Sequence, residues 1–400
     1  MKFFTSRSNV VMASRRLMAE PRWRVLYVID SLARSGAEQS LVSMAPHLLE
    51  NGIDLEVAYL FERQGLLQDL EGAGVRTHAV TAPRSRTGRL RALRGLIRER
   101  RPDLVHTTLF ESDVAGRVAA RLCGVPSVSS LVNIAYKGLP EEDQGLNRVK
   151  VAAARRADML TAKMAVRFHA ISDYVATEMS RTLRVPRDRI EVIPRGRAAS
   201  QLGLRSTDRS ARVRHQLRIG DSQVLLLAAA RHEFQKGLDL LLDAMPAILE
   251  RLPSAVLLVA GRPGLQTPGL KRKICELGLT DRVRLLGVRS DVPDLIAAAD
   301  LFVLPSRWEG LGSVLLEALA LRCPIVASDL PPVRETVSGV AALVDVRDTR
   351  LFAAAVSRMA QDKIAAMVAA EAGYRRFRER YAVERIALEM SSFYQRALVR

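Results

Sequence analysis

Short apolar runs alternate with segments of helical periodicity along most of the chain, and this alternation limits the fold more than any other feature. Helical patterns lie between the runs, for example at 38–51, 114–122 and 174–182. Alternating strands and helices build parallel sheets with helices on both faces. In the first half, the strand candidates are 25–29, 55–60, 104–106, 128–132, 168–171 and 190–193.

The alternation breaks once, in a polar stretch rich in Gly, Ser and Arg at 195–210, and then resumes. A chain of 400 residues is also too long for one ordinary core. We therefore predict an α/β protein with two Rossmann-like, doubly wound parallel-sheet domains facing across a cleft. In the second half, the strand candidates are 224–229, 255–260, 283–286, 301–304, 324–327 and 341–344.

Two carboxylates flank a glycine loop after the strand candidate 301–304. Glu309 precedes Gly310 and Gly312, and Glu317 follows within a helical segment. A strand–glycine loop–helix junction leaves N–H groups free to bind an anion, whereas carboxylates accept hydrogen bonds from sugar hydroxyls. The combination favours a ligand with both phosphate and sugar. Two solvated surface acids are the alternative.

A second motif follows the strand candidate 224–229. Arg231 comes just after the strand, and Lys236 with Gly237 opens a helix. A rigid guanidinium fork and a mobile ammonium suit a diphosphate, and they would stabilise the charge that develops on a departing nucleotide. Cations of purely structural origin are the alternative.

Gly36 marks a third helix N-terminus, after the first strand candidate. The alternative is a plain turn. Ligands of such sheets bind beyond the carboxyl ends of the strands. We therefore expect Gly36, Arg231 and Glu309 to face one cleft.

These segments resemble the retaining glycosyltransferases of family 4, which have the GT-B fold. The stretch 309–318, Glu-Gly-Leu-Gly-Ser-Val-Leu-Leu-Glu-Ala, is similar to the Glu-x7-Glu signature of that family, with Leu311 in place of Phe. Ala230 and Ser35 each stand where the family has Gly. The resemblance implies catalytic roles for Arg231, Lys236 and Glu309, and donor-binding roles for Gly310, Leu311, Gly312, Glu317 and Gly36.

The resemblance also implies an organisation and an activity. We expect a flexible leader at 1–22, an acceptor domain at 23–198, a donor domain at 199–375, and a helix at 376–400 that crosses back to the first domain. The activity would move a sugar from a nucleotide-diphosphate-sugar to an acceptor hydroxyl, with retention, onto a lipid-linked or polysaccharide-precursor acceptor. A nucleotide-sugar epimerase and a non-catalytic nucleotide-sugar or lipid-binding protein are the alternatives.

Three residues of the first half bear on the acceptor side. Asn133 stands where many family members have a His near the donor sugar, and an amide cannot act as a general base. His106 ends a strand candidate and is either an acceptor-side group or a core histidine. We interpret His169, which ends another strand candidate, as structural.

The chain has a net charge of +18, which favours acidic partners. Its basic stretches lack interleaved aromatic residues, so we exclude a single-strand nucleic-acid platform. The stretch 84–101 is either a solvated helix face or a contact with anionic lipid. Its membrane-contact candidates are Arg86, Arg89, Arg91, Arg94 and Arg98.

No Asp-x-Asp and no Cys/His cluster occurs, so we expect no metal and no cofactor besides the nucleotide-sugar substrate, such as a UDP- or GDP-sugar. The three cysteines are far apart, and we expect them to be buried small residues of a reducing compartment. No apolar run is long enough for a spanning helix. We expect a cytoplasmic protein, peripheral on the inner face of the cell membrane if lipid contact occurs. Nothing in the sequence indicates the oligomeric state.

Overall fold

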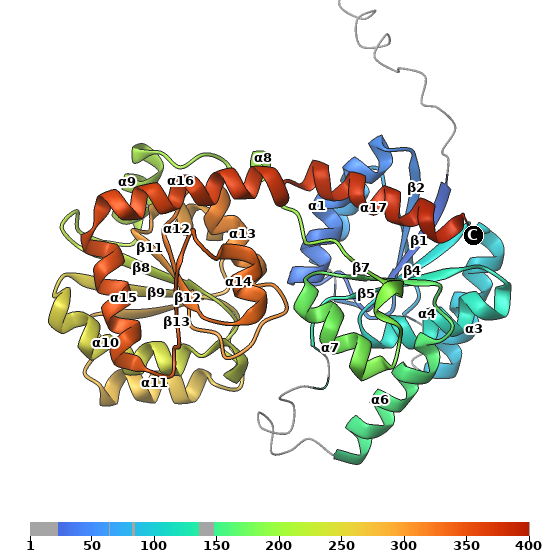
Figure 1. Ribbon diagram of the computed structural model, residues 1–400, viewed down its shortest axis with the longest axis horizontal. Helices are drawn as coiled ribbons and strands as arrows, with labels where there is room; N and C mark the ends of the chain where they lie inside the picture. Colours follow the sequence, from blue (N-terminus) through green and yellow to red (C-terminus); the bar gives the residue numbers. More distant parts are fainter. Residues whose placement is uncertain (1–22, 64, 82–84, 135, 137–147, 400) are drawn as a thin grey trace, which may run out of the picture. The chain divides into compact units, whose positions relative to one another are not determined.

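The computed structural model describes residues 23–399 except 64, 82–84, 135 and 137–147. The leader expected at 1–22 lies outside the described residues. Two sheets organise the fold (Figure 1). The strands of the first are β1 (Trp23–Ile29), β2 (Ile53–Tyr59), β3 (Arg76–Ala79), β4 (Leu104–Thr108), β5 (Ser127–Leu131), β6 (Arg167–Ala170) and β7 (Ile190–Val192).

The first sheet has seven strands in the order β3-β2-β1-β4-β5-β6-β7, and each pair whose register is described is parallel. The strand order reverses between β1 and β4, which creates a topological switch point there. The helices of this half are α1 (Gly36–Glu50), α2 (Leu67–Gly72), α3 (Arg86–Arg100), α4 (Phe110–Cys123), α6 (Arg148–Ala162) and α7 (Asp173–Leu183), with the short η1 (Arg187–Arg189).

The second sheet has six parallel strands in the order β10-β9-β8-β11-β12-β13. Its switch point lies between β8 and β11. The loops that follow these two strands are the ones that carry Arg231 and Glu309. The strands are β8 (Val224–Ala229), β9 (Ala255–Ala260), β10 (Val283–Gly287), β11 (Leu301–Leu304), β12 (Ile325–Ser328) and β13 (Ala342–Val344).

Helices cover the second sheet because their apolar stripes pack on its buried strands. Leu241 and Met245 of α10 are fully buried in a core cluster with Leu226 and Leu257 of the sheet. The helices of this half are α8 (Ala199–Leu202), α9 (Thr207–Gln216), α10 (Leu238–Arg251), α11 (Thr267–Glu276), α12 (Val292–Ala298), α13 (Ser313–Ala320), α14 (Pro331–Val337), α15 (Thr349–Gln361), α16 (Lys363–Arg380) and α17 (Val383–Leu398), with the short η2 (Phe234–Lys236).

The described chain divides into two compact units. The first comprises residues up to 129, 164–166 and the stretch from 387 onwards, and the second comprises 130–163 and 167–386. The first unit is therefore closed by residues of α17. The Nδ1 of His106 lies 2.7 Å from the hydroxyl oxygen of Tyr394, and both side chains are fully buried.

The prediction of two doubly wound parallel sheets is confirmed. Strand β3 was not predicted, because its sequence Arg-Thr-His-Ala is polar and it pairs with one neighbour at the sheet edge. The stretch 195–210, where the alternation breaks, contains the short α8 and the start of α9. Cys323 is buried as expected, whereas Cys275 is exposed. In the part of the chain that is described, no helix is long and apolar enough to cross a membrane.

Candidate functional site

The loop after β8 is held in place by a glycine. Gly237 has φ +60° and caps the N-terminus of α10. A Cβ at this position would lie 2.0 Å from the carbonyl oxygen of Pro305, which follows β11. Only glycine therefore lets the Arg231–Lys236 loop approach the end of β11 so closely.

The loop after β11 carries the first acid of the Glu-x7-Glu motif. Glu309 and Leu311 are buried, at 6% and 3% exposed. Gly312 adopts φ +75° and caps the N-terminus of α13, so the loop turns directly into the helix. Glu317 is the fifth residue of α13, one turn beyond its start.

An ion pair joins the two loops across the switch point. The Nζ of Lys236 donates to Oε1 of Glu309 at 2.5 Å, and the Ser306 hydroxyl donates to the same oxygen at 2.8 Å. The side chains of Lys236 and Glu309 are 17% and 7% exposed. A carboxylate this buried requires a charged partner. Two residues predicted to bind different parts of a donor are thus brought together.

A second ion pair supports the first, and the sequence analysis missed it. Arg307 donates two hydrogen bonds to the Asp239 carboxylate, at 2.7 and 2.6 Å, and its guanidinium lies 3.9 Å from the ring centroid of Phe234. Burial alone would raise the pKa of Asp239, but the hydrogen bonds and charge of Arg307 hold that pKa below its usual range. The Asp that follows Lys-Gly in the second motif was the available signal.

Arg231 is placed differently from Lys236. Its side chain is exposed at the end of β8, and within the described residues its guanidinium has no ion-pair partner. It is the cation of this loop that an incoming anion would meet without first breaking an internal contact. Lys236 and Arg231 therefore provide one held and one accessible positive charge.

Glu317, the second acid, contacts the stretch between the two sheets. Nε of Arg197 donates to its Oε1 at 3.0 Å. The Nη1 of Arg195 donates to the hydroxyl of Ser313, the first residue of α13, at 2.8 Å. Neither arginine was predicted to take part in the site.

The Gly310 loop also contacts residues that follow the first sheet. The Ser172 hydroxyl donates to the Gly310 carbonyl at 2.7 Å. A Cβ on Gly310 would lie 3.0 Å from the Val132 carbonyl oxygen and 3.4 Å from Cα of Asn133. Asn133 is exposed after β5. The acceptor-side candidate Asn133 thus lies beside the donor-side candidate Gly310.

His106 is not an accessible acceptor-side group. It is fully buried on β4, and its ring lies 4.3 Å from that of Tyr27. Its core environment supports the structural alternative that the sequence left open. His169 is likewise enclosed, because its ring nitrogens lie 2.8 Å from the Ser130 hydroxyl and 2.7 Å from the Ile193 carbonyl oxygen.

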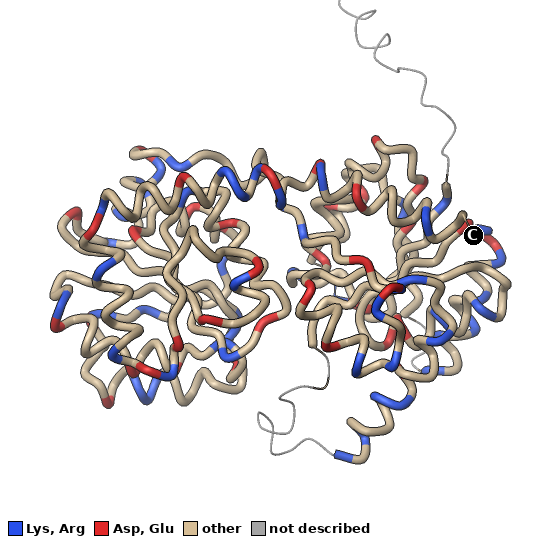
Figure 2. Tube along the Cα trace, in the orientation of Figure 1, with Lys and Arg blue, Asp and Glu red and all other residues tan. Residues whose placement is uncertain are grey.

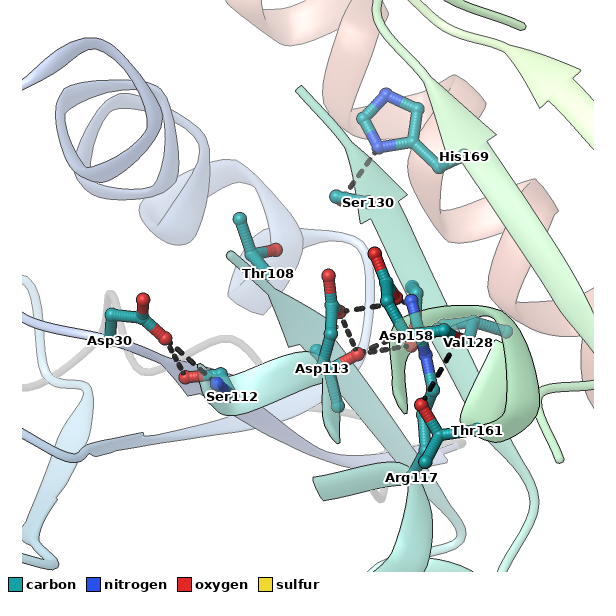
Figure 3. A network of polar contacts seen from close by, with 12 residues as sticks. Asp30, Thr108, Ser112, Asp113, Arg117, Val128, Ser130, Asp158, Thr161 and His169 are labelled. Atoms are coloured by element: carbon teal, nitrogen blue, oxygen red, sulfur yellow. Dashed lines mark hydrogen bonds and ion pairs between the residues drawn. The ribbon is translucent and has the colours of Figure 1, made fainter. Parts of the chain in front are cut away.

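In the first unit, the loops after β1 and β4 are also joined. Asp30 accepts hydrogen bonds from the backbone N–H and the hydroxyl of Ser112, at 2.8 and 2.7 Å (Figure 3). Burial raises the pKa of Asp30 even though these hydrogen bonds oppose the rise. Gly36 begins α1 in the same unit, where Ser35 hydrogen-bonds to the Glu38 carboxylate.

Behind this loop junction lies a buried polar network that no sequence pattern indicated. The Arg117 side chain is fully buried, and its Nε donates to the Ser129 hydroxyl at 2.7 Å. Thr107 bridges that hydroxyl and the Asp113 carboxylate, at 2.6 and 2.5 Å. Figure 3 shows Asp113 and Arg117 converging from α4.

The five arginines predicted to contact a membrane do not form one exposed face of α3. Arg86 pairs with Glu111 at 2.6 Å. Arg89 is buried, with its guanidinium 4.8 Å from the ring centroid of Phe61. Arg94 is partly buried, whereas Arg91 and Arg98 are exposed. Arg86 is also exposed despite its ion pair, so Arg89 and Arg94 are the two that are at least partly buried.

Two family models match the chain, one for each half. Residues 21–196 match the glycosyl transferase 4-like domain, and residues 222–362 match the glycosyl transferases group 1. The matched segments contain Gly36, and Arg231 with Glu317, respectively.

Curated relatives belong to the same class. A lipopolysaccharide core biosynthesis mannosyltransferase of Rhizobium meliloti is 34% identical over 41% of this chain and 49% of its own length. An Escherichia coli galactosyltransferase, named for a GlcNAc-diphosphoundecaprenol substrate, is 27% identical over 67% of this chain and 69% of its own. The chain thus matches about half of the first relative and two thirds of the second.

Solved structures share the fold. HepE of Anabaena in complex with UDP and glucose superposes with a TM-score of 0.81 at 21% identity, over 93% of this chain and 99% of that one. WaaG, a glycosyltransferase involved in lipopolysaccharide biosynthesis, superposes with a TM-score of 0.72 at 15% identity, over 92% and 99%. With both halves of the chain matched by family models and the fold shared, the chain belongs to the group 1 glycosyltransferases of the family 4 type, with the GT-B fold.

Proposed function

We propose that the chain transfers a sugar, with retention, from a nucleotide-diphosphate-sugar to an acceptor hydroxyl. The observation that carries the proposal is the buried Lys236–Glu309 pair at the switch point of the second sheet, with the accessible Arg231 beside it. Cations at this position suit the diphosphate, and the carboxylate suits sugar hydroxyls.

The proposed chemistry depends on charge rather than on a general base. As the bond between sugar and diphosphate breaks, negative charge grows on the leaving phosphate, and Arg231 and Lys236 stabilise it. Donor binding would draw Lys236 towards phosphate and leave Glu309 to accept from the sugar. Since Asn133 cannot take a proton, the leaving phosphate would accept the proton of the acceptor hydroxyl.

The organisation expected from the resemblance stays part of the proposal. Residues 23–198 would bind the acceptor, 199–375 the donor, and 376–400 would complete the first domain. The two cations would replace a metal, so activity should survive EDTA. By similarity to the relatives above, the acceptor would be a lipid-linked or polysaccharide precursor. The location expected from the sequence, the inner face of the cell membrane, stays part of the proposal.

Release of nucleoside diphosphate from UDP-, GDP- and ADP-sugars tests the activity, with and without a membrane lipid extract. We expect release that depends on the extract and falls by orders of magnitude in Arg231→Ala, with an unchanged circular dichroism spectrum. An Arg231→Ala rate within threefold of wild type would contradict the role of Arg231. Conversion of the donor without acceptor would indicate an epimerase, and binding without release a non-catalytic protein.

The double variant Lys236→Met/Glu309→Gln separates structure from chemistry. Lys236→Met alone leaves a buried charge unpaired and should cost about 3 kcal/mol of unfolding free energy. Neutralising Glu309 as well should restore most of that stability, because no unpaired charge remains. Nucleotide release should stay as low as in the single variant. Recovery of activity together with stability would show that the pair acts only structurally.

For the membrane surface, α6 is a second candidate beside α3. Arg155 and Arg156 are exposed on α6, and Val149 and Leu160 of the same helix are 77% and 51% exposed. Figure 2 shows Lys and Arg along this helix. Exposed basic residues interleaved with apolar ones suit an anionic lipid interface. We propose that α6 makes the principal contact.

Sedimentation with phosphatidylglycerol-containing vesicles compares the two helices. Arg155→Glu/Arg156→Glu should lower vesicle binding by about tenfold or more, because each basic residue contributes about 1 kcal/mol near an anionic surface. Arg91→Glu/Arg98→Glu on α3 is the matched charge change. An equal loss of vesicle binding in both double variants would show that net charge alone matters. Retained binding in Arg155→Glu/Arg156→Glu would refute the proposal that α6 makes the principal contact. Phosphatidylcholine vesicles provide the uncharged control.

A further inference from the structure

The backbone of the segment between the two sheets is fixed at Arg197. The Arg197 N–H donates to the Tyr381 carbonyl at 3.0 Å, and the Val383 N–H donates to the Arg197 carbonyl at 3.2 Å. The preceding residue, Gly196, has no room for a side chain, since a Cβ would lie 2.7 Å from Cα of Val383. Arg197 therefore projects from a rigid support rather than from a loose linker.

The side chain of Arg197 is buried against α13. Its Nε donates to Oε1 of Glu317 at 3.0 Å, and its Nη1 donates to the Gly196 carbonyl at 3.0 Å. The side chains of Arg197 and Glu317 are 6% and 14% exposed. Burying a guanidinium is costly unless its charge is paired, so the pair fixes both side chains.

Glu317 retains one oxygen for a ligand. Its Oε1 is occupied by Arg197, whereas Oε2 has no partner within the described residues, and the side chain is not fully enclosed. A carboxylate with one oxygen held by an arginine is fixed in rotamer, and its second oxygen is still able to accept a hydroxyl hydrogen. The Arg197 charge also offsets a negative charge that would otherwise repel a nearby diphosphate.

We infer that Arg197 is a positioning residue, which holds Glu317 so that its second oxygen accepts a hydrogen bond from a ribose hydroxyl of the donor nucleotide. The inference rests on the proposed function, since it takes a nucleotide-sugar as the ligand. It adds a residue outside the Glu-x7-Glu motif to donor recognition. Arg195 supports the same helix one turn earlier, through Ser313.

The test measures discrimination between ribose and deoxyribose. Calorimetric titration of UDP, GDP and ADP identifies the diphosphate that binds, and its 2′-deoxy and 3′-deoxy forms are then compared in wild type and Arg197→Met. Met fills the volume of the arginine stem but removes every donor. Arg209→Met is the matched control, because Arg209 is 13% exposed and pairs with Asp294 at 2.6 Å away from α13.

We expect wild type to bind the ribonucleotide about tenfold more tightly than at least one deoxy form, as a charge-assisted hydrogen bond predicts. Arg197→Met should lose most of this ratio, Arg197→Lys should recover part of it, and Arg209→Met should keep it. In turnover assays, the KM for donor should rise more than kcat falls. A purely structural arginine would weaken both nucleotide forms equally.

The outcomes separate this inference from the proposed function. An unchanged ribose-to-deoxyribose ratio in Arg197→Met, with normal nucleotide release by wild type, would overturn the role of Arg197 alone. Wild type that binds none of the three diphosphates would overturn both. Should Arg197→Met fail to fold, Arg197→Gln, which also removes the charge, carries the same comparison, and a wild-type ratio in that variant together with an unchanged KM refutes the inference.

Discussion

At the scale of single residues, His169 has a charge state that the fold controls directly. Its Nε2 faces the Ile193 carbonyl, which can only accept, so Nε2 carries the proton and Nδ1 accepts from Ser130. Burial lowers the pKa of His169 from 6.5 to about 4. The neutral ring is thus built into the folded state.

This pKa predicts how stability depends on pH. The folded pKa lies below the unfolded one, so the contribution of His169 is complete above pH 6.5 and is lost as pH falls towards 4. The loss amounts to roughly 3 kcal/mol. Urea unfolding between pH 7.5 and 4.5 measures it. His169→Gln can keep both hydrogen bonds without titrating, and it should show a flatter profile; parallel profiles would refute the assignment.

The residues of the site differ in how far sequence could reveal them. Glu309 and Lys236 were identifiable because each follows a strand and adjoins glycine, which is a local pattern. Arg197 and Arg307 were not, since their partners Glu317 and Asp239 lie far away in the sequence. Their roles follow from pairing across loops, for which an arginine-rich chain offers many equivalent candidates.

At the scale of elements, the junction of η2 and α10 depends on one glycine. Gly237→Ala combines a strained φ of +60° with a Cβ placed 2.0 Å from the Pro305 carbonyl. Gly339 has a similar φ of +77° but nothing within 4 Å of a Cβ, so Gly339→Ala isolates the backbone strain.

We expect Gly339→Ala to lower the unfolding free energy by about 1 kcal/mol, and Gly237→Ala by about 3 kcal/mol or more. Denaturant unfolding of both variants measures the difference. Gly237→Ala should also weaken nucleotide binding, because the β8 loop must move away from β11. Equal destabilisation by the two substitutions would mean that the β8 loop moves away from Pro305 with no further loss of unfolding free energy.

Element prediction succeeded where burial leaves a periodic signal. The strands β8, β9 and β11 were found to within a residue, because they are apolar runs buried on both faces. β3 has no such signal, and its place is fixed by pairing with β2. For α3, helical spacing predicted the helix but not which arginines face solvent, because it did not reveal that Arg89 packs on Phe61.

At the scale of the whole molecule, the two-sheet plan follows from chain length and βα alternation. The closure of the first unit by residues beyond 387 is not a local property. It depends on buried contacts such as Tyr394 with His106, which lie 288 residues apart in the sequence. Only the resemblance to a family suggested it.

Removing the residues after 386 should destabilise the first unit selectively. Met390, Phe393 and Tyr394 are buried, and losing each such side chain costs roughly 2 kcal/mol. The chain has two tryptophans, Trp23 in the first unit and Trp308 in the second. In single-tryptophan variants of the truncated chain, we therefore expect the transition reported by Trp23 to move to a lower denaturant concentration, and that reported by Trp308 to stay unchanged.

Tyr394→Phe is the control for this truncation, since it keeps the helix and removes one hydrogen bond. It should shift the Trp23 transition by the equivalent of about 1 kcal/mol. A truncated chain whose two transitions both stay at the wild-type midpoint would show that α17 contributes nothing to the first unit.

The discontinuous first unit has a consequence for how the protein is made. A ribosome emits its polypeptide from the N-terminus, so residues 387 onwards emerge only after the second unit has been synthesised. Domains usually mature in order of synthesis. Here the second unit can complete its folding first, although its synthesis starts later. The first unit lacks residues 387 onwards until the end of synthesis, so His106 stays without its Tyr394 contact until then. Chaperones that shield apolar surface on nascent chains would be needed most at that stage.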